Sequence, residues 1–110
     1  MPARFEVLLT NDAQLDLEDV YDYIALHDGP DRAAHVLDRI ENALESLARF
    51  PQRGPYPAEL LALGIREYRQ SYLKPYRLIY RIVGRAVYVY LIADGRRDMQ
   101  TLLARRLLGA

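Results

Sequence analysis

Apolar and polar residues alternate near the start of the chain, where Phe5, Val7 and Leu9 are separated by Glu6 and Leu8. A spacing of two is typical of a β-strand, so we expect a short strand over residues 5–9. The next three residues, TND, offer side-chain oxygens that can cap the N-terminus of a helix. Acidic residues follow in the first turns, where the helix dipole stabilises negative charge. A helix is therefore expected to begin there.

Two amphipathic helices come next. Apolar residues recur at helical spacing from Ala13 to Ile24, with acids on the other side, and again from Ala33 to Leu47. The residues HDGP at 27–30 predict a break, because Gly suits the end of one helix and Pro the first turn of the next. Phe50-Pro51 ends the second helix. A connection this short predicts an antiparallel helical hairpin.

The second half of the chain has the spacing of strands. After loop residues 51–57 and a brief helical turn at 59–63, strands are expected at 65–72, 75–82 and 86–92, the last one central because it is almost wholly apolar. Asp98 can cap a short final helix with an apolar face. The sequence thus predicts an α+β fold: an N-terminal strand, an antiparallel helical hairpin, a three-stranded antiparallel meander and a short C-terminal helix. We expect residues 1–110 to form one domain.

The amino-acid composition and simple sequence patterns exclude several classes of protein and of binding site. The chain has no cysteine, which excludes disulfides and thiolate metal sites. No signal-peptide pattern opens the sequence and no apolar run approaches the roughly 20 residues that cross a bilayer, so we expect a cytoplasmic protein without a membrane partner. There is no Gly-rich phosphate loop and no His pair at metal spacing, and we expect no cofactor and no metal.

Charge is divided unevenly between the two halves, although the whole chain is neutral. Residues 1–50 hold four arginines and eleven acids, a net charge of −7, whereas residues 51–110 hold ten arginines and one lysine against four acids, a net charge of +7. Such asymmetry is a recognised sign of an interaction surface. The alternative is that the two halves complement each other within one fold.

Cations and tyrosines are interleaved in the basic half, and six of the nine tyrosines lie within residues 68–90. Arg and Tyr together suit phosphate contact and base stacking in RNA binding, and equally suit a protein-binding surface. Pairing with the acidic helices is the structural alternative. The candidate target-binding residues are Arg66, Arg69, Lys74, Arg77, Arg96 and Arg97.

Several segments in order resemble toxins of the RelE/ParE superfamily of type II toxin–antitoxin systems. They are the helical segment AQLDLEDVYDYI at 13–24, the helix that ends at Phe50-Pro51, the following Gly54, YRLIY at 76–80 and GRRD at 95–98. The resemblance covers nearly the whole chain, and it implies the RelE/ParE fold and a toxin neutralised by a cognate antitoxin.

Two activities are known within this superfamily, and the resemblance allows either. RelE-like members cut messenger RNA on the ribosome without a metal, using basic residues and a Tyr or His near the C-terminus; here Arg77 and Arg97 match the basic positions. ParE-like members inhibit DNA gyrase. Residues 97–101 contain no Tyr or His, and general acid–base catalysis without such a group loses on the order of 100- to 10,000-fold in rate. We therefore favour the ParE-like branch, with no catalytic residue, and keep the ribosome-dependent ribonuclease as the alternative.

The resemblance also implies a hetero-oligomer with a short, acidic-tailed antitoxin. Two amphipathic helices on a small sheet offer a groove for a partner helix and an edge for a partner strand. We expect the antitoxin to contact apolar positions beside the first helix and the sheet, namely Leu15, Val20, Tyr23, Tyr88 and Tyr90.

Overall fold

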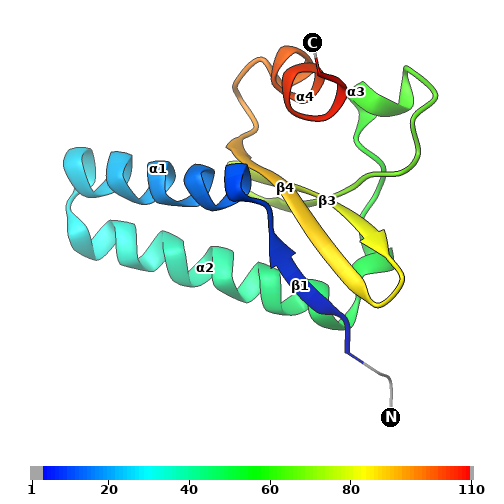
Figure 1. The fold of residues 1–110 in the computed structure, drawn as a ribbon. Coiled ribbons are helices and arrows are strands. Elements are labelled where there is room, and N and C mark those ends of the chain that lie inside the picture. The colour runs from blue at the N-terminus through cyan, green and yellow to red at the C-terminus, as the bar shows by residue number, and fades with distance from the viewer. Residues whose placement is uncertain (1–3, 110) are drawn as a thin grey trace.

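The computed structural model describes residues 4–109, which form a four-stranded sheet with helices against both of its faces (Figure 1). In chain order the elements are β1 (Glu6–Leu9), α1 (Asn11–Asp28), α2 (Pro30–Arg49), the 3-10 turn η1 (Pro51–Arg53), α3 (Ala58–Leu61), β2 (Arg69–Leu73), β3 (Tyr76–Val83), β4 (Ala86–Asp94) and α4 (Met99–Leu108). The expected α+β order is confirmed.

The strands lie in the order β1-β4-β3-β2. Strands β2, β3 and β4 form the antiparallel meander, and β1 lies parallel to β4 in the register Val7 to Val87. The strand at 86–94 is therefore central, as its apolar sequence predicts. Sequence spacing alone says nothing about where β1 joins the sheet, because a parallel pairing across some eighty residues leaves no local signal.

The helical hairpin is formed by local chemistry. The Thr10 hydroxyl accepts a hydrogen bond from the Ala13 N–H and so caps α1. Gly29 has a φ of 95°, a conformation that Gly adopts readily, and it allows α2 to begin at once with Pro30 in its first turn. The two helices pack side by side over one face of the sheet (Figure 1).

Two separate apolar cores hold the layers together. The larger lies between the hairpin and one sheet face and includes Ala13, Ile40 and Tyr80. The smaller lies between the other face and the layer of α3 and α4, and it includes Leu60, Leu91 and Leu103. In Figure 1, α4 and α3 lie beside each other, on the other side of β3 and β4 from the helical hairpin. The apolar face of α4 therefore docks on the body, as the sequence predicts.

A β-bulge lets one strand serve both cores. The register between β3 and β4 shifts after Ile79, which pairs with Leu91, so that Tyr80 pairs with Val89 and Tyr90 is the extra residue. Beyond the bulge the alternation of faces changes, and Leu91 packs beneath α4 while Val89 packs beneath the hairpin.

Boundaries in the basic half differ from the expected ones. The strand expected at 65–72 begins only at Arg69, because the Ile65 N–H bonds back to the Leu60 carbonyl and the chain reaches the sheet later. The strand expected at 86–92 runs on to Asp94, which pairs with Tyr76. None of the described helices is both long and apolar enough to cross a membrane.

Candidate interaction site beside helix α1

A groove of about 510 Å³ lies between α1 and the turn that follows β4. Val20, Ile24, Tyr76 and Ile92 give it an apolar floor, and Ile24 and Ile92 are buried. Helix α1 contributes one wall because residues three, four and seven apart share one side of a helix. The remaining lining residues are polar and come from both sides of the groove: Asp16, Asp19, Tyr23, Asp28, Ala93, Asp94, Arg96 and Arg97.

Charges of opposite sign stand at the two sides of this groove. The Asp94 carboxylate accepts two hydrogen bonds from Arg96, from Nε to Oδ1 at 2.9 Å and from Nη2 to Oδ2 at 2.5 Å. These bonds hold the pKa of Asp94 below its usual range. Asp19 and Asp28 form no ion pair within residues 4–109, and neither does Arg97. Burial raises the pKa of Tyr76, and the Asp94 carboxylate raises it further. The unpaired charges are free to meet a partner.

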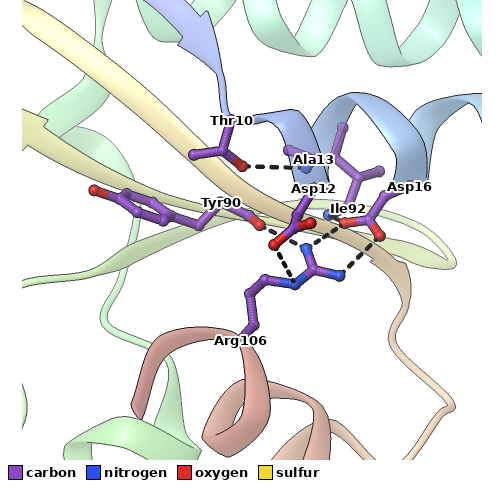
Figure 2. A network of polar contacts seen from close by, with 7 residues as sticks. All are labelled: Thr10, Asp12, Ala13, Asp16, Tyr90, Ile92 and Arg106. Carbon is purple, nitrogen blue, oxygen red and sulfur yellow. Dashed lines mark hydrogen bonds and ion pairs between the residues drawn. The ribbon is translucent and has the colours of Figure 1, made fainter. Parts of the chain in front are cut away.

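Asp16, at the inner wall, ties three elements together (Figure 2). Its Oδ2 accepts from the Ile92 N–H at 3.0 Å and from Arg106 Nη1 at 2.8 Å, while Oδ1 accepts from Arg106 Nη2 at 3.0 Å. Arg106 also donates to the Tyr90 carbonyl at 2.7 Å. The network joins α1, the bulge of β4 and α4, and the carboxylate raises the pKa of Arg106 still further, so that this guanidinium stays charged.

Arg77, one of the candidate target-binding residues, lies inside the protein and is 9% exposed. Its Nη1 and Nη2 each donate to Glu59 at 2.8 Å, and its Nε donates to Gln70 Oε1 at 2.8 Å. These bonds hold the pKa of Glu59 below its usual range. A guanidinium occupied along both edges is not available to a ligand, so Arg77 fits a structural role and does not fit the surface role that its sequence suggests.

The other candidate target-binding cations are spread over the molecule. Arg69 is half-buried and donates to the carbonyls of Gln52 and Gly54, at 3.2 and 2.8 Å, so it braces the loop before α3. Arg66 is exposed in the segment before β2. Lys74 is exposed in the β2–β3 turn, whose Pro75 carbonyl accepts from the Gly95 N–H. Lys74 thus shares one end of the sheet with Arg96 and Arg97, and Arg66 and Arg69 are elsewhere.

The candidate antitoxin-binding residues divide between two faces. Leu15 and Tyr23 are exposed on α1, and Val20 lines the groove. Tyr90 packs edge-on against Tyr68 in the smaller core, at 5.5 Å between ring centroids. Tyr88 shares that face because Val87 and Val89 on either side of it point toward the hairpin. The five residues therefore do not line a single groove. Leu15, Val20 and Tyr23 form one surface on α1.

Sequence reasoning missed the roles of Asp16, Glu59 and Asp94 and the bonded state of Arg106. Arg106 is bonded to Asp16, 90 residues away in the sequence. No pattern marks such a pair. Among residues 4–109 there is no group of three or more His, Asp or Glu side chains arranged to hold a metal ion.

The arrangement of charged and apolar side chains suits binding, and comparison with known proteins identifies the family. The family model described as the ParE toxin of the type II toxin–antitoxin system, parDE, matches residues 7–99. The chain belongs to the ParE toxin family.

Individual relatives agree with this assignment. Toxin ParE3 of Caulobacter vibrioides is 29% identical over 100 residues, which cover 91% of this chain and 96% of that protein. A solved structure of the chromosomal ParDE system from P. aeruginosa superposes with a TM-score of 0.71 at 18% identity and covers 84% of this chain and 98% of that one. A solved structure of the RelBE2 toxin–antitoxin complex of Mycobacterium tuberculosis superposes with a TM-score of 0.58 at 24% identity. The match covers 86% of this chain and 94% of that one. These two structures share the fold with this chain, and the family model confirms the ParE-like expectation.

Proposed function

We propose that this ParE-family chain is a cytoplasmic toxin that stops growth by binding DNA gyrase, and that a cognate antitoxin neutralises it. Of the two activities known in the superfamily, the burial of Arg77 favours gyrase inhibition over the ribonuclease activity. The ribonuclease alternative needs Arg77 at the surface, and here Glu59 and Gln70 occupy its guanidinium. A second observation supports the proposal: residues 96–109 contain no Tyr or His.

The acting surface that we propose is the turn after β4. Arg96 and Arg97 are exposed there, and Lys74 lies at the same end of the sheet. Arginine is enriched at protein–protein hot spots, and it makes charge-assisted contacts with carboxylates. Arg69 and Arg77 are excluded from this surface because their guanidinium groups are bonded within the protein.

A short pulse of expression tests the target. We expect a change in plasmid supercoiling and induction of the DNA-damage response within one or two generations, with messenger RNA remaining intact on ribosomes. Co-expression of the antitoxin should prevent all of these effects. Codon-specific cleavage of ribosome-bound messenger RNA, with unchanged supercoiling, would instead establish the ribonuclease activity. Purified gyrase, assayed with the toxin alone, gives the direct measurement.

A further inference from the structure

A second pocket, of about 220 Å³, opens where the end of α2 and the turn η1 meet strand β2. Two exposed aromatic side chains line it, Phe50 at 43% and Tyr72 at 62% exposure. The guanidinium of Arg53, which is also exposed, lies over the Phe50 ring, 3.8 Å from its centroid. We call Phe50, Arg53 and Tyr72 the η1 patch. Aromatic residues beside an arginine are the composition that protein-binding hot spots favour.

The loop at residues 50–55, which carries two of the three patch residues, is fixed from within. The buried Tyr80 hydroxyl donates to the Pro51 carbonyl at 2.5 Å, and Arg69 Nη1 donates to the Gly54 carbonyl at 2.8 Å. Gly54 leaves no room for movement, because a Cβ there would meet the Tyr80 hydroxyl. A surface that is already in place loses less conformational entropy when a partner binds.

The charge of the pocket is positive. None of the described residues that line it is acidic, and Arg53 is the single cation among them. Arg53 forms no ion pair within residues 4–109, and neither does the exposed Arg49 just before Phe50. The N–H groups of an arginine match a carboxylate in pairs, so the pocket is complementary to an acidic ligand.

The form of the pocket favours a protein segment over other acidic ligands. A groove for a nucleic-acid strand follows the phosphates with a row of cations, whereas this pocket has one. A second copy would bring its acidic helix α1 here in a head-to-tail contact, but most oligomers are closed and two-fold symmetric. An apolar side chain flanked by Asp or Glu fits both the aromatic walls and Arg53.

Strand β2 connects the η1 patch with the proposed acting surface. Tyr72 lies two residues before Lys74, which corresponds to about 7 Å of extended chain. Lys74 in turn lies at the same end of the sheet as Arg96 and Arg97. An ordinary protein interface covers about 800 Å² of each partner, which is enough to include both surfaces.

We propose that the η1 patch is a second contact with gyrase, and that it binds a gyrase segment in which an apolar side chain adjoins Asp or Glu. The apolar side chain packs on Phe50 and Tyr72, and the carboxylate bonds to Arg53. The inference rests on the proposed function, because gyrase is the occupant.

Charge reversal at the patch tests the inference. The variant is Arg53→Glu, and the matched control is Arg105→Glu, another exposed and unpaired arginine, on the helix that packs on the opposite face of the sheet. Purified gyrase is the probe, and its dissociation constant and the toxin concentration that half-inhibits supercoiling are measured. We expect both to rise at least about tenfold for Arg53→Glu. Both should stay within about twofold of wild type for Arg105→Glu.

Further variants separate the paired N–H groups from charge alone. Arg53→Lys keeps the charge and loses the planar fork of donors, so it should recover only part of the affinity for gyrase. Tyr72→Ala leaves the charge unchanged and should weaken binding through the lost apolar contact. Melting temperatures are measured for all variants, and Arg53→Gln replaces Arg53→Glu if the latter does not fold, with the same direction expected.

The outcomes distinguish this inference from the function on which it rests. Wild-type toxin that neither binds nor inhibits gyrase would overturn the proposed function. Equal inhibition of gyrase by wild type and Arg53→Glu would overturn the inference alone. The inference also fails if Arg53→Glu acts on gyrase as wild type does and instead loses affinity for a single-stranded oligonucleotide, for a second copy of the chain or for the antitoxin.

Discussion

Arg77 and Arg97 have the same side chain, yet their environments in the fold differ. Arg77 is enclosed, with Gly95 beside its aliphatic part; a Cβ at Gly95 would lie 2.9 Å from Arg77 Cδ. Arg97 is exposed in the turn after β4. The difference arises because Arg77 is on an inner strand whose side chains point into the sheet faces, where charge is tolerated only with a partner such as Glu59.

Replacing Arg77 should therefore damage the fold. Arg77→Ala leaves Glu59 and Gln70 without their partner, and we expect the free energy of unfolding to fall by about 3 kcal/mol. Chemical denaturation measures it. Arg66→Ala, at an exposed position, is the control and should change the free energy by less than about 0.5 kcal/mol. An Arg77→Ala protein as stable as wild type would contradict the structural role.

The same pair predicts a dependence on pH. Arg77 lowers the pKa of Glu59 below its ordinary value of 4.5, so the carboxylate contributes stability that is present above that value and is lost as pH falls through the lowered pKa. The difference in unfolding free energy between wild type and Glu59→Gln should be full at pH 7 and shrink below pH 4.5. Denaturation at several pH values measures it, with exposed Glu67→Gln as control. A difference that does not change with pH would count against the pairing.

At the scale of elements, helix α4 is held by two kinds of contact. Met99 and Leu103 are buried in the smaller core, and Arg106 bonds to Asp16 and to the Tyr90 carbonyl (Figure 2). The helix begins where Asp98 accepts from Thr101, from the backbone N–H at 3.2 Å and from the hydroxyl at 2.7 Å, bonds that lower the pKa of Asp98. Ten residues are too few for a stable helix in isolation, so α4 depends on its docking.

Removing the polar contact should loosen α4 selectively. Arg106→Ala removes the ion pair of Asp16, which keeps only its bond from the Ile92 N–H, and removes a donor to the Tyr90 carbonyl. We expect the free energy of unfolding to fall by about 2 kcal/mol. Hydrogen exchange in α4 should become faster than in α2. Arg105→Ala, the exposed neighbour, is the matched control and should leave exchange unchanged. If α4 exchanges alike in both variants, the apolar contacts alone hold it.

The turn before α4 has the opposite character, because its cations do not hold the fold together. The Arg96–Asp94 pair is on the surface, where ion pairs contribute from nothing to about 1 kcal/mol. We expect Arg96→Ala with Arg97→Ala to abolish growth inhibition while the melting temperature stays within a few degrees of wild type. Growth and melting are measured together, with Arg32→Ala and Arg49→Ala, exposed on α2, as control. A double variant that is still fully toxic would move the acting surface elsewhere.

At the scale of the whole molecule, the two oppositely charged halves are only partly joined to each other. Arg106 and Asp16 connect them, whereas Arg77 pairs with Glu59 within the basic half. Internal complementation therefore accounts for part of the asymmetry, and the unpaired acids of α1 and the unpaired Arg97 of the turn account for another part. Both remain exposed on opposite sides of one groove.

Antitoxin binding should stabilise the whole toxin. A ligand that binds only the folded state adds about 2.7 kcal/mol at a concentration 100 times its dissociation constant. For a chain of 110 residues this corresponds to a rise in melting temperature of roughly 10–20 °C. A thermal shift assay at increasing antitoxin concentration measures it. An unchanged melting temperature of wild type would mean that no complex forms.

Local sequence by itself determined the elements and their order. The capping oxygen of Thr10, the Gly29-Pro30 break and the alternation within 75–82 each act over a few residues, and each predicted an element that the structure contains, the strand with bounds shifted by one residue. Short-range sterics and hydrogen bonding are enough for these features.

Only the tertiary structure decided which polar residues are free to contact a partner and which hold the fold together. A one-residue bulge at Tyr90 sets which face each side chain of β4 meets, and the Ile92 N–H next to it is bonded by Asp16, 76 residues away. Gly54 was part of the family resemblance, and its reason is likewise distant: a Cβ there would lie against the Tyr80 hydroxyl and 2.5 Å from the Gln70 carbonyl oxygen. Pairings of this kind depend on register and close approach between segments that local patterns do not connect, so the sequence shows the charges, and the fold determines which of them remain free.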